Sequence, residues 1–202
     1  RRQRQMCIRD SLITLKQAYL KIGNDFKAAE TFELQNELYP VSTNYNSIGV
    51  LYSNAGATDK AIEFYEKAIE ENPHDKHAYA NLGSTLLYKK PKQAKEYLQK
   101  ALNIDPEHDI ALIELGKIDK SEGNTVAAQV KFRKAYDLYL KQWKTNSLPK
   151  YAYGWFATVA EELGENNFAK EIRASAPKTE SEAYYNKENL SMTKTKALTN
   201  NN

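Results

Sequence analysis

The sequence predicts an all-α fold, an array of about five helix-turn-helix units stacked in chain order. Three observations carry this prediction. Within residues 42–75, large and small side chains recur at i, i+3, i+4 and i+7, the spacing of one helix face. A glycine and a proline interrupt the pattern where one helix must end and the next begin. The same order of residues returns at intervals of roughly 34 residues, as in arrays whose units bury their apolar faces against neighbours.

Residues 42–75 show the complete pattern. The first helix carries a large, large, small and aromatic set: Tyr45, Ile48, Gly49 and Tyr52. The second helix carries a small, aromatic and small set: Ala61, Tyr65 and Ala68. Gly56 separates the two helices, and Pro73 ends the second because proline does not continue a helix interior.

This order of residues resembles the tetratricopeptide repeat. The resemblance implies a right-handed superhelical solenoid in which the first helix of each pair lines the concave side. It also implies a mode of action, the binding of a protein or peptide in that concave groove, without naming the partner.

The first predicted repeat, residues 9–41, departs from the pattern. Its apolar positions, glycine and closing proline are in place: Leu12, Leu15, Tyr19, Gly23, Ala28, Phe32 and Pro40. However, Lys16 and Gln35 stand where the family usually has small residues, which fits a terminal or truncated repeat. Residues 1–8 are predicted to be a non-native or disordered lead, because residues 1–11 resemble a translated sequencing-adaptor string. A native basic arm, or the first turn of a helix, is the alternative.

The third predicted repeat, residues 76–108, keeps the pattern with a shorter inter-helix turn. Its defining residues are Tyr79, Leu82, Gly83, Leu86, Ala94, Leu98, Ala101 and Pro106. Pro91 follows two lysines where the glycine is usual, and proline is compatible with the first turn of the next helix.

The fourth and fifth predicted repeats, residues 109–149 and 150–177, differ in length. No proline ends the second helix of the fourth repeat, and an apolar and aromatic face carries it on to about Lys144: Tyr136, Tyr139, Leu140 and Trp143. The fifth repeat carries Arg173 in an aromatic position, as suits a terminal unit with a polar outer face. Residues 178–190 can add a capping turn, and the polar residues 191–202 are predicted to be disordered.

Charge and composition exclude several classes of function. The formal net charge is +3, and it resides in residues 1–10, which hold four arginines against one aspartate, so the rest of the chain is neutral. A basic stripe for nucleic acid is therefore not expected. No apolar run is long enough to span a membrane. A single cysteine excludes an internal disulfide framework. The chain begins with Arg1, so an upstream targeting segment could be missing, and the compartment stays open with the cytoplasm as the default.

Residues able to carry chemistry are few. His74, His77 and His108 follow prolines in turns, where a solvated polar role is the interpretation we favour over a metal or proton-transfer site. No nucleophile with a base, no phosphate-binding loop and no metal motif is present. The sequence therefore predicts no catalytic residue, no metal and no cofactor.

The resemblance implies which residues line the groove. The predicted groove residues are Asn46, Asn81, Ser84, Tyr88, Ile113, Lys117, Tyr151 and Trp155. Asparagine amides both donate to and accept from a peptide backbone, and aromatic residues anchor interfaces. Packing of Tyr151 and Trp155 against the helix of Trp143 is the competing interpretation. Family members that clamp acidic chaperone tails need Lys, Arg or Asn where this chain has Val50, Ile110 and Glu114, so that clamp is absent.

Three functions follow in order of preference. The first is a non-catalytic protein-interaction scaffold that binds a peptide or a helix. The second is an accessory segment of a larger enzyme, such as a repeat-fused transferase, with its catalytic domain elsewhere. The third is RNA binding, against which the neutral charge and Glu114 count.

Overall fold

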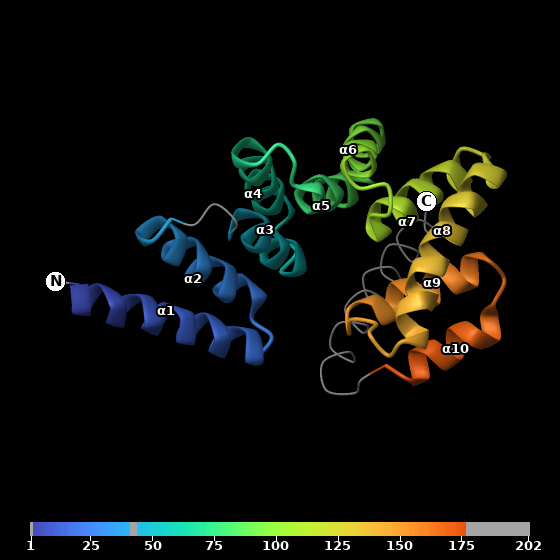
Figure 1. The fold of residues 1–202 in the computed structure, drawn as a ribbon. Coiled ribbons are helices and arrows are strands. Elements are labelled where there is room, and N and C mark those ends of the chain that lie inside the picture. The colour runs from blue at the N-terminus through green and yellow to red at the C-terminus, as the bar shows by residue number, and fades with distance from the viewer. Residues whose placement is uncertain (1, 41–43, 177–202) are drawn as a thin grey trace, which may run out of the picture. The chain divides into compact units, whose positions relative to one another are not determined.

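A computed structural model describes residues 2–40 and 44–176, and within these ranges the chain forms ten helices and no strand (Figure 1). The all-α prediction is confirmed. The helices form consecutive pairs: α1 (Arg2–Lys21) with α2 (Asp25–Leu38), α3 (Asn44–Asn54) with α4 (Thr58–Glu71), α5 (Lys76–Leu86) with α6 (Pro91–Ile104), α7 (Asp109–Ser121) with α8 (Thr125–Lys144), and α9 (Ala152–Glu162) with α10 (Asn166–Ala174). The capping turn and tail predicted for residues 178–202 lie outside the described residues.

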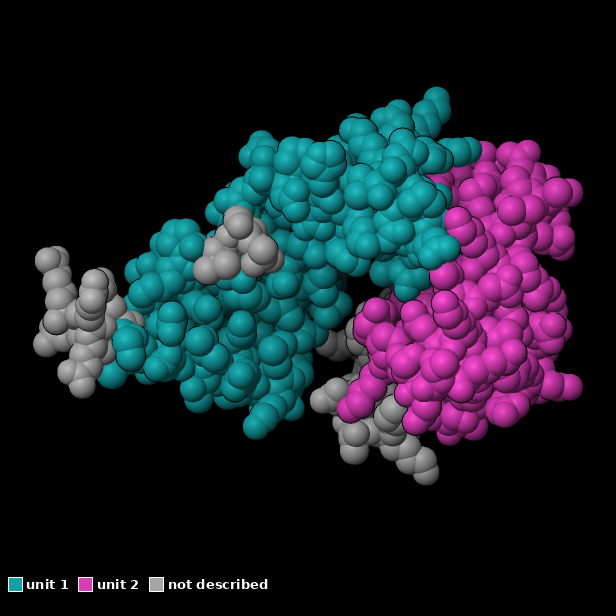
Figure 2. All heavy atoms as spheres, viewed as in Figure 1, with its two compact units in different colours: residues 1–114 teal, residues 115–202 magenta. Residues whose placement is uncertain are grey.

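The chain divides into two compact units, Arg1–Glu114 and Leu115–Asn202 (Figure 2). The division falls inside α7, and the sequence pattern, which predicts one continuous array, contains no sign of it. Unit 1 contains the three hairpins α1–α2, α3–α4 and α5–α6, followed by the first part of α7. Unit 2 contains the last part of α7 together with α8, α9 and α10.

Small residues sit where paired helices approach closely. A Cβ atom added to Gly49 would lie 2.6 Å from the Tyr65 ring, and one added to Gly83 would lie 2.6 Å from Leu98 Cγ. In unit 2, a Cβ on Gly116 would lie 2.6 Å from the ring of a phenylalanine in α8. At each of these positions a large side chain of the partner helix occupies the volume that a Cβ would need, so the close packing requires glycine.

The turns between helices follow local rules. Gly56 has a φ of 76° and Gly123 a φ of 83°, a left-handed conformation that glycine adopts without steric penalty. Asp75 begins α5 by accepting hydrogen bonds from the backbone N–H groups of His77 and Ala78. Proline 91 stands in the first turn of α6, where its missing N–H leaves no helical hydrogen bond unmade.

The end of α8 is held by aromatic residues of unit 2. At 20 residues, α8 exceeds α4 and α6, each with 14 residues, and Trp143 lies in its last turn. The Trp143 ring centroid is 6.0 Å from that of Phe156 in α9 and 6.1 Å from that of Phe168 in α10. The extension therefore fills the space beside α9 and α10 with aromatic side chains.

Asp119 stands in α7 where the repeat pattern usually has an aromatic residue. Its carboxylate is 2.5 Å from Lys131 Nζ of α8, and the residue is buried. An ion pair thus replaces the usual apolar contact between the two helices at this position.

Helix α1 differs from the sequence expectation at its beginning. Residues 1–8 are expected to be a disordered or non-native lead, but the helix begins at Arg2. Neither glycine nor proline occurs between Arg2 and Lys21, and extending an existing helix is far easier than nucleating one. The hydroxyls of Ser11 and Thr14 donate to the carbonyls of Cys7 and Asp10 along this helix. The interpretation of residues 1–11 as an adaptor string stays a prediction.

Candidate functional site

Four of the eight predicted groove residues form two separate pairs. Asn46 and Asn81 meet in unit 1, and Lys117 and Trp155 meet in unit 2. The remaining four predicted residues are Ser84, Tyr88 and Ile113 of unit 1 and Tyr151 of unit 2.

Asn46 and Asn81 are bonded to each other. Asn46 lies on α3 and Asn81 on α5, and Asn81 Nδ2 donates to Asn46 Oδ1 at 3.0 Å. Both residues are half-buried. An asparagine amide carries two N–H donors and an oxygen with two lone pairs, so the mutual bond leaves most of each amide's capacity for a ligand. The sequence identified both residues but could not show that they touch.

The other three predicted residues of unit 1 differ in their exposure. Ile113 is fully buried in α7, a helix covered along most of its length, so it does not line an open surface. Ser84 is half-buried, and its buried hydroxyl oxygen has no hydrogen-bond partner among the described residues. Tyr88, in contrast, is 87% exposed just beyond the end of α5.

Trp155 in unit 2 lies against a cation. Lys117 Nζ of α7 is 4.9 Å from the Trp155 ring centroid, within the range of a cation–π interaction. The rings that contact Trp143 include Tyr153 and Phe156, which lie on α9 with Trp155. Trp155 is half-buried, and Tyr151 before α9 is 60% exposed. Within the described part of the chain, the ring contacts of Trp143 do not include Trp155.

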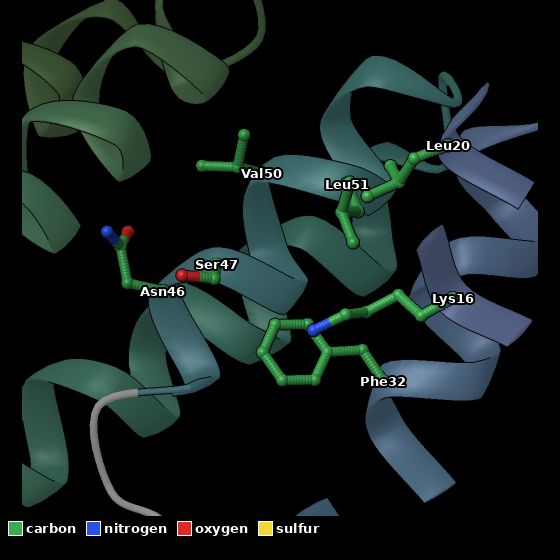
Figure 3. A pocket seen from close by; sticks show the side chains of 7 residues that line it. All are labelled: Lys16, Leu20, Phe32, Asn46, Ser47, Val50 and Leu51. Atoms are coloured by element: carbon green, nitrogen blue, oxygen red, sulfur yellow. The ribbon is translucent and has the colours of Figure 1, made fainter. Parts of the chain in front are cut away.

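A pocket that the sequence did not predict lies between α1, α2 and α3 of unit 1 (Figure 3). Its volume is about 320 Å³, and it is lined by Lys16, Leu20, Phe32, Asn46, Ser47, Val50 and Leu51. Lys16 Nζ lies 3.5 Å from the Phe32 ring centroid. Burial lowers the pKa of the Lys16 ammonium group, because a low-dielectric environment disfavours the charged form. The feature of the sequence that pointed to this pocket was Lys16, which stands where the repeat usually has a small residue.

A histidine pair was also missed. His108 is only 4% exposed, and its Nε2 lies 3.1 Å from Nδ1 of His77. Because His108 Nδ1 accepts the backbone N–H of Ala111 at 3.4 Å, we assign the His108 proton to Nε2, which donates to His77. Burial lowers the pKa of His108. The expected solvated turn is therefore wrong for His108, which ties the start of α7 to α5.

Neither a metal-binding cluster of side chains nor a helix able to span a membrane is found among the described residues. Over residues 2–40 and 44–176, no group of three or more His, Cys, Asp and Glu side chains is arranged to hold a metal ion. In the same part of the chain, none of the helices combines the length and apolar character needed to cross a bilayer.

Family models identify two of the hairpins. The model for the tetratricopeptide repeat matches residues 45–75, and a second model with the same description matches residues 77–108. Residues 45–75 and 77–108 are therefore identified as tetratricopeptide repeats. These two matches cover α3–α4 and α5–α6, the hairpins that supply Asn46 and Asn81.

A curated relative carries the same repeats in a longer chain. Tetratricopeptide repeat protein 6 of Homo sapiens is 30% identical over 95 residues, which are 46% of this chain and 18% of that protein. The chain therefore spans less than a fifth of this relative.

Solved structures share the fold. A thermophilic tetratricopeptide repeat protein from Thermus thermophilus superposes with a TM-score of 0.61 and 15% identity, covering 83% of this chain and 89% of that one. An O-GlcNAc transferase mutant from Thermobaculum terrenum superposes with a TM-score of 0.55 and 16% identity, covering 67% of this chain and 27% of that one. Repeats of this fold thus occur both as most of a protein and as part of a transferase.

Proposed function

We propose that this chain is a non-catalytic interaction scaffold that binds a peptide or a helix of a protein partner on the α3–α5 face of unit 1. The observation that carries the proposal is the Asn46–Asn81 pair, two half-buried amides from successive repeats joined at 3.0 Å. Their mutual bond orients both amides in advance, so a ligand backbone meets groups that have little rotamer freedom left to lose.

A second contact surface lies in unit 2. Trp155 supplies a large aromatic area, and Lys117 holds one face of its ring. Tyr151 extends this surface before the start of α9. Aromatic side chains of this kind are the commonest anchors of protein interfaces. We propose that the surface formed by Lys117, Tyr151 and Trp155 also contacts a protein partner, and that neither nucleic acid nor a membrane is bound.

The alternative function is that of an accessory segment of a larger enzyme. The similarity to a portion of an O-GlcNAc transferase favours it, since this chain covers only 27% of that protein. Sequencing the complete reading frame separates the two functions. A catalytic domain fused to these repeats would support the accessory role.

Peptide display against the purified chain tests the scaffold proposal. Affinity for a selected peptide, measured by calorimetry, should fall about fivefold in Asn81→Ala, the equivalent of roughly 1 kcal/mol for one hydrogen bond. Asn54→Ala is the matched control, because Asn54 is an exposed amide at the end of α3. Equal affinity of wild type and Asn81→Ala would contradict the proposed site.

For the unit 2 surface, a peptide that binds there should lose about 2 kcal/mol of binding free energy in Trp155→Ala, as for an interface hot spot. The thermal unfolding midpoint should change little. Unfolding of α9 and α10 in this variant would instead show that Trp155 is a core residue. A single-stranded RNA of mixed sequence tests the proposal that no nucleic acid is bound. Salt-dependent binding of this RNA would contradict that proposal.

A further inference from the structure

Lys16 is a cation placed in an apolar environment. Its ammonium group lies over the Phe32 ring (Figure 3), and the apolar residues that also line the pocket are Leu20, Val50 and Leu51. No carboxylate forms an ion pair with Lys16 in the described part of the chain, whereas Lys27 of the neighbouring helix pairs with a glutamate at 2.7 Å. Lys16 is half-buried, and even partial removal of a cation from water without an anion is unfavourable, with a ring face compensating for only part of that loss.

The repeat pattern explains how the cation comes to be there. Lys16 occupies the position of Gly49 and Gly83, where even a Cβ would lie 2.6 Å from the facing side chain. A lysine cannot occupy that space, so its side chain extends over Phe32 toward α3. The pocket of about 320 Å³ lies beside this side chain. This volume is at the small end of ligand sites and fits one or two amino-acid side chains.

The polar edge of the pocket indicates what kind of molecule enters it. Ser47 and Asn46 stand on the α3 side, and Asn46 is also the acceptor for Asn81. The pocket is therefore continuous with the amide pair proposed above to bind a peptide backbone. A peptide held by those amides would place a neighbouring side chain at the pocket, which favours a peptide over a free small carboxylic acid.

We infer that the pocket receives an apolar side chain of a partner peptide and that an adjacent Asp or Glu of the same peptide forms an ion pair with Lys16. The inference rests on the proposed scaffold function and specifies the chemistry of its partner. A carboxylate on the ammonium group adds a charge-assisted hydrogen bond in a partly desolvated place, where such bonds are strongest. The apolar side chain covers Leu20, Val50 and Leu51.

Parallel peptide selections test the inference. A library of random nine-residue peptides is selected against the wild type, against Lys16→Met and against Lys21→Met. Methionine keeps the length and apolar character of the lysine stem while removing the charge. Lys21 ends the same helix, is exposed and does not line the pocket, so it controls for the loss of one positive charge.

We expect wild type and Lys21→Met to enrich peptides with an acidic residue beside a large apolar one. Lys16→Met should keep the apolar preference and lose the acidic one. For a selected peptide, changing its Glu to Gln should weaken binding to the wild type about fivefold or more, and binding to Lys16→Met by less than about twofold. Amide resonances of Val50 and Leu51 should shift when the peptide is added.

Three results would overturn the inference, and they are distinguishable. If wild type and Lys16→Met select peptides with the same acidic preference, Lys16 does not bind the peptide carboxylate, and the scaffold function would stand. Recovery of no peptide by any of the three proteins would overturn the scaffold function as well. Binding of free 4-phenylbutyrate at the pocket without enrichment of any acidic peptide would also overturn the inference, and would assign the site to a small carboxylic acid.

Discussion

The α1–α2 and α5–α6 hairpins place different residues at the same repeat position. In α5, Gly83 faces Leu98 so closely that a Cβ would lie 2.6 Å from Leu98 Cγ. In α1, Lys16 occupies this position, its Nζ lies 3.5 Å from the Phe32 centroid, and a pocket lies beside it. The comparison shows that a glycine at this position goes with close packing against the partner helix, whereas the lysine goes with a pocket beside it.

Among the substitutions that test this comparison, Gly83→Leu should produce the largest change in the free energy of unfolding. The new side chain would meet Leu98 and also the backbone oxygen of Ala94, which lies 3.1 Å from the place where a Cβ on Gly83 would stand and cannot rotate away. We expect the free energy of unfolding to fall by at least roughly 1–3 kcal/mol, as for overpacked cores. Urea denaturation followed by circular dichroism measures it.

Lys16→Leu is the matched control for that substitution. It places the same side chain at the same repeat position, but in a hairpin whose native residue there is already a long side chain. The free energy of unfolding should change by less than about 1 kcal/mol, as for volume-conserving exchanges. Equal losses in the two variants would show that the two positions are not equivalent.

The close contact between a glycine and a large side chain of the paired helix was predictable from the sequence, because both residues belong to the same hairpin. Gly49 and Tyr65, or Gly83 and Leu98, belong to paired helices that a short turn brings together. Local periodicity is sufficient for such contacts. Local periodicity also predicted the length of α8, because its aromatic face continues to Trp143 without an intervening proline.

The site depends on contacts between hairpins, which periodicity does not give. Asn46 and Asn81 are 35 residues apart, and His77 and His108 are 31 apart. Whether such residues touch depends on the rotation and offset between successive hairpins, and a shift of one helical position separates them. For the same reason, the burial of Ile113 and the position of the Lys16 ammonium group over an aromatic ring could not be read from the sequence.

Lys16→Gly should make the first hairpin resemble the third. Glycine in a helix interior lowers stability by about 1 kcal/mol, and closer packing of α1 on Phe32 offsets part of that loss. The pocket should narrow, so selected acidic peptides should lose measurable binding while the free energy of unfolding changes by about 1 kcal/mol or less. Titration by calorimetry and urea denaturation check the two parts. Unchanged peptide binding would show that Lys16 does not shape the pocket.

The junction between α5 and α7 should respond to pH. Burial lowers the pKa of His108 below its ordinary value, although Asp109 and Asp105 attract a proton and His77 and Lys76 oppose it. The folded state therefore favours neutral His108, and the unfolded chain takes up its proton first. This contribution to stability is complete above the ordinary histidine pKa of about 6.5 and is lost as the pH falls below it.

Unfolding midpoints in urea measured between about pH 5 and 8 test this dependence. His108→Asn is the control, because asparagine can still cap α7 while it does not titrate. The variant should show a shallower fall in stability toward acid than the wild type. Identical pH profiles would show that His108 does not couple protonation to folding.

The smallest effect is expected from shortening α1 to resemble α5. Helix α1 has 20 residues and α5 has 11, and the difference includes the first turns, where Met6, Cys7 and Ile8 are exposed. Deleting residues 1–8 removes the exposed side chains of Met6, Cys7 and Ile8, so the helical signal should fall only in proportion to the residues removed. The unfolding midpoint and the affinity of pocket-binding peptides should stay the same, because Lys16 and Leu20 lie in the retained turns. A cooperative loss of helix or of peptide binding would instead show that the first turns of α1 support the hairpin, and that the pocket depends on a longer helix than the repeat pattern requires.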